Sequence, residues 1–111
     1  MKGSGLEEVI TGYKVVTADL RSLGLRQNPN ILTYPVGHWY FLPPQRVVSG
    51  KGDYGGIWVV RTLSAARRLK NYMRDHHGVE TRIFEAHIAR ILYLNSYRIK
   101  TDGVFLTEEI N

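Results

Sequence analysis

The sequence predicts one α+β domain at residues 12–111, with a mostly antiparallel sheet of five to seven short strands and one principal helix, 64–77, packed on one face. Short segments rich in β-branched and aromatic residues recur between glycine and proline turns, which is typical of strands. One amphipathic segment has both the start and the stop signals of a helix. The 111 residues suffice for one hydrophobic core but not for two. Residues 1–11 are expected to form a flexible terminus.

The predicted helix follows a predicted interior strand. Residues 57–60 are apolar on both alternating faces, as in a strand that is covered on each side. Thr62 or Ser64 is expected to cap the helix by accepting a hydrogen bond from a free N–H of its first turn. Gly78 suits the left-handed position at the end of the helix. Apolar residues recur at three- and four-residue steps between these ends (Ala65, Ala66, Leu69, Tyr72, Met73 and His76).

Short strands are predicted before this helix. Residues 12–18 read as the first strand, and 28–30 as a turn. Residues 31–34 and 38–42 predict two short strands on either side of Pro35. Because proline offers no backbone N–H, this part of the chain should lie at a sheet edge or break at Pro35. Another short strand is expected to begin at 46–48.

The second half of the chain is harder to interpret. Residues 81–94 fit both a helical stripe and strand alternation, and the pattern alone leaves the alternatives open. Residues 97–100 alternate as a strand does. Asp102-Gly103 indicates a type I′ hairpin that would pair Ile99 with Leu106. The passage from strand 57–60 through the helix predicts one parallel strand pair, right-handed if it forms.

The formal net charge of +5 is concentrated in one segment. Residues 46–100 contain eleven basic and four acidic residues, and either a polyanion partner or a solvated basic surface would explain them. The chain has no cysteine, no apolar run of the roughly 18 residues that a membrane span needs, and no hydrophobic region behind its first residues. We therefore expect no disulfide, no membrane partner and a cytoplasmic location.

A small basic binding module with DNA or RNA as its partner is the predicted function. Basic residues on and beside one ridge of the helix are candidate phosphate contacts (Arg61, Arg67, Arg68, Lys70 and Arg74). The glycine-rich loop 50–56 is a candidate anion-binding nest to which Lys51 adds charge. Tyr40 or Tyr54 would stack on bases. A solvated helix face and a mobile hairpin turn are the competing interpretations of the ridge and the loop.

Two further functional classes remain open. Arg21, Tyr34 and Glu108 or Glu109 follow the order of an early Arg, a middle Tyr and a late Glu that is similar to that of ADP-ribosyltransferases, and an RNA-cleaving enzyme is the related alternative. A protein-interaction or homo-oligomeric subunit would use an exposed strand edge at 38–42. No catalytic residue is assigned. The four histidines lack the spacing of metal ligands, so no metal and no cofactor are predicted.

Several short motifs occur in a fixed order along the chain: Tyr13-Lys14-Val15, Tyr34-Pro35-Val36-Gly37 with Trp39-Tyr40, Gly56-Ile57-Trp58-Val59, the alanine-bearing helix, and Lys100-Thr101-Asp102 with Glu108 or Glu109. Together they resemble a family of small phage and bacterial domains of unknown function. The family usually has His where this chain has Trp58. The resemblance implies a strand at 81–89 and implies no particular activity.

Overall fold

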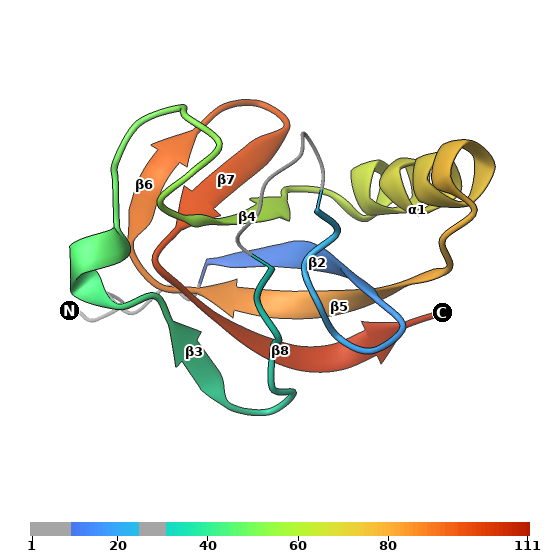
Figure 1. Cartoon of the computed structure of the whole chain (residues 1–111), viewed down its shortest axis with the longest axis horizontal. Helices are drawn as coiled ribbons and strands as arrows, with labels where there is room; N and C mark the ends of the chain where they lie inside the picture. The colour runs from blue at the N-terminus through green and yellow to red at the C-terminus, as the bar shows by residue number, and fades with distance from the viewer. Residues whose placement is uncertain (1–9, 25–30) are drawn as a thin grey trace, which may run out of the picture.

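The computed structural model describes residues 10–24 and 31–111, so most of the expected flexible terminus and the predicted turn at 28–30 lie outside the described residues (Figure 1). Within these ranges the chain forms one α-helix and seven strands. The strands are β2 (Thr11–Thr17), β3 (Trp39–Phe41), β4 (Ile57–Val60), β5 (Thr81–Ile88), β6 (Ile91–Leu94), β7 (Arg98–Thr101) and β8 (Gly103–Ile110). The helix is α1 (Leu63–His77), and Pro44–Arg46 form a short 3₁₀ helix, η2. The predicted α+β class is therefore confirmed.

The strands form one sheet in the order β3-β8-β5-β2-β4-β7-β6, and all its paired strands run antiparallel. β2 lies in the middle and pairs with β5 from Thr11↔His87 to Thr17↔Thr81. On its other side β2 pairs with β4 at a single position, Tyr13↔Val60. The sheet therefore opens between β2 and β4.

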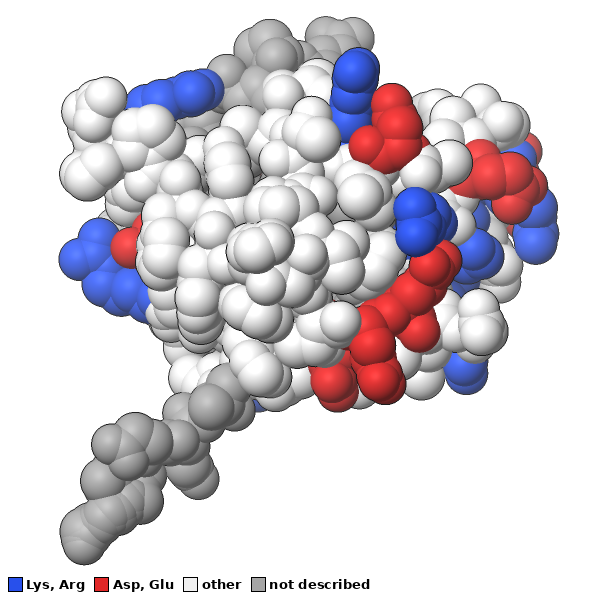
Figure 2. Space-filling model, turned by 90° about the horizontal axis from the view of Figure 1, so that it is seen from below, with Lys and Arg blue, Asp and Glu red and all other residues white. Residues whose placement is uncertain are grey.

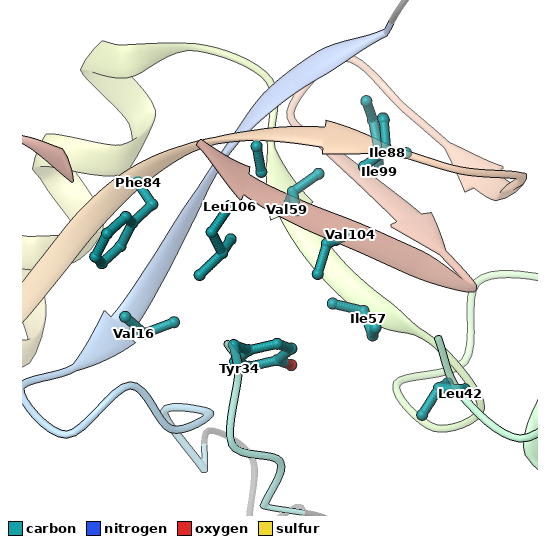
Figure 3. Packing of buried hydrophobic residues seen from close by; sticks show 11 residues of the cluster. Val16, Tyr34, Leu42, Ile57, Val59, Phe84, Ile88, Ile99, Val104 and Leu106 are labelled. Carbon is teal, nitrogen blue, oxygen red and sulfur yellow. The ribbon is translucent and has the colours of Figure 1, made fainter. Parts of the chain in front are cut away.

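The larger core cluster lies on the face of the sheet opposite the helix. It joins side chains of β2, β4, β5, β7 and β8 to Tyr34 and Leu42 from the segment that crosses this face (Figure 3). Val16, Ala86 and Leu106 are fully buried there. Both halves of the sheet thus contribute to one core.

Helix α1 packs on the other face, where Val15, Val60 and Ile83 meet Ala65 and Ala66. The start and the stop of the helix agree with the sequence. Thr62 Oγ1 accepts a hydrogen bond from the Ala65 N–H at 3.1 Å. Gly78 takes a φ of 66° and its N–H donates to the Arg74 carbonyl oxygen at 3.1 Å.

Two predicted pairings are wrong. β4 and β5 do not form a parallel pair, because β2 lies between them and is antiparallel to both. β7 and β8 do not form a hairpin, since β7 pairs with β4 and β6 while β8 pairs with β5 and β3. The Asp102 side chain instead accepts a hydrogen bond from the Arg90 N–H at 3.0 Å, which ties this corner to the β5–β6 connection.

Two short strands are also absent from their predicted places. Residues 31–34 contribute only an isolated bridge, Arg21↔Thr33. The strand expected at 46–48 is replaced by the end of η2 and an extended Val47, because Pro44 favours the first turn of a helix. Residues 81–94, whose pattern was ambiguous, form the strands β5 and β6.

The prediction of an edge strand near Pro35 is confirmed by β3, which lies at one end of the sheet. Trp39 and Phe41 on this strand are stacked with ring centroids 5.4 Å apart, and they remain 45% and 53% exposed. Figure 2 shows the molecule from the side on which β3 and β8 lie in Figure 1. Much of that face is uncharged, and charged side chains gather toward the end where the C-terminus lies.

Candidate functional site

A cleft of about 310 Å³ opens where β2 and β4 separate. Both strands line it, together with residues 22–24, Tyr34, the 53–56 stretch and the Tyr97-Arg98 pair. Its volume falls at the lower end of the range for small-ligand sites. The cleft lies where the two strands, which pair at one position only, no longer form a continuous ladder.

Lys14 lies in this cleft, although it belongs to the middle of a core strand. Its side chain is 8% exposed, and its ammonium donates a hydrogen bond to the Trp58 carbonyl oxygen at 2.8 Å. The Lys14 nitrogen also lies 5.1 Å from the centroid of the Tyr34 ring. No carboxylate among the described residues forms an ion pair with it. Burial therefore lowers the pKa of Lys14 to about 8.

Tyr34 and Ser22 hold the covering segment in place over Lys14. The Tyr34 hydroxyl lies 3.3 Å from Ser22 Oγ, which accepts a hydrogen bond from the Leu32 N–H at 3.0 Å. Burial raises the pKa of Tyr34 to about 12, and the hydrogen bond with Ser22 opposes that shift. The phenol therefore stays neutral at physiological pH and can donate or accept a hydrogen bond.

An aromatic ring and a cation form the side of the cleft. The Arg98 guanidinium lies 3.8 Å from the centroid of the Trp58 ring, and Arg98 Nη2 is 3.6 Å from Asp53 Oδ1. Trp58 Nε1 donates to the Asp53 carbonyl oxygen at 3.2 Å. Trp58 is therefore half-buried and fixed in the rim of the cleft. The charged lining residues are Lys14, Arg46 and Arg98 against Asp53, a net formal charge of +2.

The glycine-rich loop 50–56 is bound to the protein at Gly50. Its N–H donates to the Leu92 carbonyl oxygen at 3.1 Å, and its carbonyl oxygen accepts from Lys100 Nζ at 2.9 Å. This amide is thus already satisfied and does not add to an anion-binding nest. Lys100 is fully buried, and burial lowers its pKa while Asp53 partly opposes the shift. Lys51 is exposed on the same loop.

Cations of the predicted helix ridge are directed largely toward the protein itself. Lys70 donates to the Thr81 carbonyl oxygen, and Arg67 Nη2 donates to the Asn111 carbonyl oxygen at 3.2 Å. Arg74 pairs with its neighbour Asp75 at 3.0 Å. The two flanking residues differ, since Arg61 donates to the Asn95 carbonyl oxygen at 2.8 Å and Arg68 is exposed.

The two tyrosines predicted to stack on bases lie in different surroundings. Tyr40 is half-buried, with its ring set edge-on to Tyr34 at 5.7 Å between centroids. Tyr54 is 62% exposed near the end of the glycine-rich loop. Of the two, Tyr54 has a ring accessible to a ligand. The predicted nucleic-acid residues come from separate elements, with Tyr40 on β3, Lys51 and Tyr54 on the glycine-rich loop, and the basic ridge on α1.

Among the described residues, no contact joins the three candidates for an ADP-ribosyltransferase-like site, which are Arg21, Tyr34 and Glu108 or Glu109. Arg21 pairs with Asp19 at 3.3 Å, Tyr34 contacts Ser22, and Glu109 pairs with Arg82 at 2.8 Å. Across residues 10–24 and 31–111, no three His, Asp or Glu side chains gather closely enough to hold a metal ion.

Sequence reasoning missed the cleft residues Lys14, Ser22 and Arg98. The signal for Lys14 was present, because strand alternation places it on the same face as Val16, which points into the core. Ser22 and Arg98 carry no comparable local signal. Their roles depend on contacts with residues far along the chain.

No helix in the described part of the chain has both the length and the apolar character needed to cross a membrane. Comparisons with protein-family models, curated proteins and solved structures found no match to this chain.

Proposed function

We propose that this domain is a small basic binding module for nucleic acid, and that unpaired nucleotides of a single strand enter the cleft between β2 and β4. The observation that supports this is the cleft lining, where three cations and one acid lie beside aromatic rings. Cations attract phosphates, and aromatic or guanidinium planes stack on unpaired bases. The Arg98–Trp58 pair offers both kinds of contact at one place.

The helix ridge has a secondary part in this proposal. A guanidinium carries five N–H donors, so an arginine that binds one carbonyl oxygen keeps others for a phosphate. Arg67, Arg68 and Arg74 on the helix, and Lys51 and Arg61 elsewhere in the basic segment, would add contacts that do not depend on sequence. We expect these residues to contribute to affinity through charge and the cleft to contribute the preference for unpaired strands.

Fluorescence anisotropy of labelled single- and double-stranded DNA and RNA at several salt concentrations tests the proposal. Wild-type protein should bind single strands more tightly, with an affinity that falls as salt rises. Arg98→Ala should weaken binding to single strands roughly tenfold, since stacking on one base contributes about 1–3 kcal/mol. Arg68→Ala is the matched control, because it removes one exposed cation from the helix and should lower affinity for all strands by a similar small factor.

Circular dichroism of both variants checks that the fold is intact, since Arg98 also pairs with Asp53. No binding of any nucleic acid at low salt would rule the function out. Equal losses of affinity in the two variants would indicate that the strand binds the general basic surface and not the cleft.

A second candidate function is self-association through the sheet edge. It is favoured by β3, an edge strand that carries the exposed stacked pair Trp39 and Phe41. Edge strands with exposed apolar side chains are ready sites for pairing with another strand. This candidate is compatible with nucleic-acid binding, because Trp39 and Phe41 do not line the cleft.

A further inference from the structure

The ammonium of Lys14 has more hydrogen-bonding capacity than the protein uses. A lysine has three N–H donors, and in Lys14 one of them reaches the Trp58 carbonyl oxygen. The described residues provide no second acceptor, and the Tyr34 ring lies beside the nitrogen. A buried cation with unused donors is costly unless an acceptor reaches it. Because Lys14 lines the cleft, that acceptor can come from a ligand.

The charges of the cleft indicate what kind of acceptor fits. At the rim, Asp53 already pairs with Arg98. The charged residues that line the cleft have a net formal charge of +2, and no carboxylate among the described residues forms an ion pair with Lys14. A phosphate monoester carries a charge of about −1.5 to −2 at pH 7, whereas an internal phosphodiester carries a single negative charge. The monoester therefore matches the cleft better.

We propose that the cleft binds a nucleoside phosphate monoester, with its phosphate on Lys14 and its nucleoside toward Arg98 and Tyr97 at the rim. The cleft of about 310 Å³ accepts a single nucleotide, not a duplex. In a nucleic acid this chemical group occurs at the phosphorylated end of a strand. The inference rests on the proposed function in taking nucleotides as the ligand, and it adds that the strand is recognised by its end.

The test compares single-stranded oligonucleotides of one sequence that end in a 5′-phosphate, a 3′-phosphate or hydroxyls only, with a fluorescent label placed away from the end under test. Wild-type protein should bind one phosphorylated form at least tenfold more tightly than the hydroxyl form. Lys14→Met should weaken binding of the phosphorylated form more than binding of the hydroxyl form, and so remove this difference. Lys70→Met is the matched control, because Lys70 also donates to a backbone carbonyl oxygen but lies on the helix, and it should keep the difference.

A second measurement uses the unaltered protein. Reductive methylation followed by mass spectrometry should show that a saturating phosphorylated oligonucleotide slows modification of Lys14. The exposed Lys51 serves as the reference for the reagent. If Lys14 reacts at the same rate with and without a bound phosphorylated strand, the inference is wrong.

Competition with a free nucleoside monophosphate and with inorganic phosphate separates the sources of the group. Displacement of the strand by the monophosphate at similar concentrations, together with loss of that effect in Lys14→Met, would support the site but assign it to a free nucleotide and contradict the strand-binding function. Equal binding of phosphorylated and hydroxyl ends would overturn the inference and leave the proposed function standing. Displacement by inorganic phosphate alone at equal concentration would also overturn it, because the nucleoside would then contribute nothing.

Discussion

Lys14 occupies a position that its charge disfavours. Its nitrogen is buried beside Tyr34, and burial lowers its pKa to about 8 from an ordinary value of 10.5. That difference corresponds to about 3 kcal/mol of folding free energy. Below about pH 8 both the folded and the unfolded chain hold the proton, and the folded state bears the full cost of burying the charge.

Between about pH 8 and 10.5 the unfolded chain still binds the proton that the folded chain has lost, so the contribution of Lys14 to stability rises with pH. We expect Lys14→Met to be more stable than the wild type at pH 7, by up to about 3 kcal/mol, and the gap to narrow up to about pH 10.5. Urea unfolding of both proteins across this range measures it. A gap that does not change with pH would show that Lys14 is not buried as a charge.

A second prediction at the scale of single residues concerns the replacement of Gly56. A Cβ built on Gly56 would lie 2.4 Å from Cγ of Lys100, whose nitrogen is fixed by the Gly50 carbonyl oxygen. Gly56→Ala should therefore displace Lys100 and lower the unfolding free energy by about 1–3 kcal/mol, as overpacking does. Gly37→Ser is a control for glycine loss, since nothing lies within 4 Å of a Cβ there and only the positive φ resists the change. Thermal unfolding that leaves Gly56→Ala equal to the wild type would contradict the close approach.

At the scale of elements, the helix α1 is held at its start by one side chain. Thr62 Oγ1 accepts a hydrogen bond from the Ala65 N–H, whereas the Ser64 hydroxyl hydrogen-bonds to the Thr62 hydroxyl at 3.3 Å and not to a backbone N–H of the first turn. Thr62→Ala should cost about 1 kcal/mol of unfolding free energy, whereas Ser64→Ala should cost little or nothing. Chemical denaturation of the two variants decides between the two caps that the sequence allowed. A greater loss in Ser64→Ala would mean that the cap is assigned to the wrong residue.

The edge strand β3 supports a prediction about self-association. Trp39→Lys should abolish any dimer by placing a charge on the strand edge. Tyr72→Lys is the matched control, because Tyr72 is also an aromatic residue that is 45% exposed, but it lies on α1. Analytical ultracentrifugation over a concentration series measures both. A wild-type chain that stays monomeric throughout would exclude this second function.

The elements that could be predicted from sequence are those with local causes. α1 and β4 are specified by a cap, a stripe, a stop and an apolar run that lie within about twenty residues of one another. Asp102-Gly103 has equally good local chemistry for a hairpin, yet the corner binds Arg90 and the strands on either side of it pair elsewhere. A local turn preference does not determine which strands pair with each other in the sheet.

The cleft could not be predicted from the sequence for the same reason. It is produced by the divergence of β2 from β4, whose one paired position joins Tyr13 to Val60, far apart in the chain. The charge pattern of the sequence instead predicted a binding surface on the helix, because exposed lysines and arginines are easiest to recognise there. Of the cleft residues, only Lys14 could be identified from the sequence, because it is a charged residue at a position of β2 that faces the core.

On the scale of the whole molecule, the sheet opens at β2 but the core does not divide. One cluster joins Val16 and Phe84 on one side of the opening to Ile57, Val59 and Ile99 on the other. We therefore expect both sides to unfold together in a single transition.

The two tryptophans allow this to be measured, because Trp39 lies on β3 at one end of the sheet and Trp58 on β4 beyond the opening. Fluorescence of the single-tryptophan proteins Trp39→Phe and Trp58→Phe, each compared with its own circular dichroism, should give coincident urea transitions. Separate midpoints for the two probes within one protein would show that the two sides are independent units.

The central place of β2 also affects the order in which the chain can fold. β2 is made before its neighbours in the sheet, and its long partner β5 follows about seventy residues later in the chain. During synthesis the edge of β2 that pairs with β5 therefore stays uncovered until β4 and α1 have emerged, and β8 comes later still. Pairings of such long sequence separation are slow to form, because the intervening loop must close first. The nascent chain therefore carries one unpaired edge of its central strand until β5 has emerged, and unpaired strand edges of this kind are prone to aggregation.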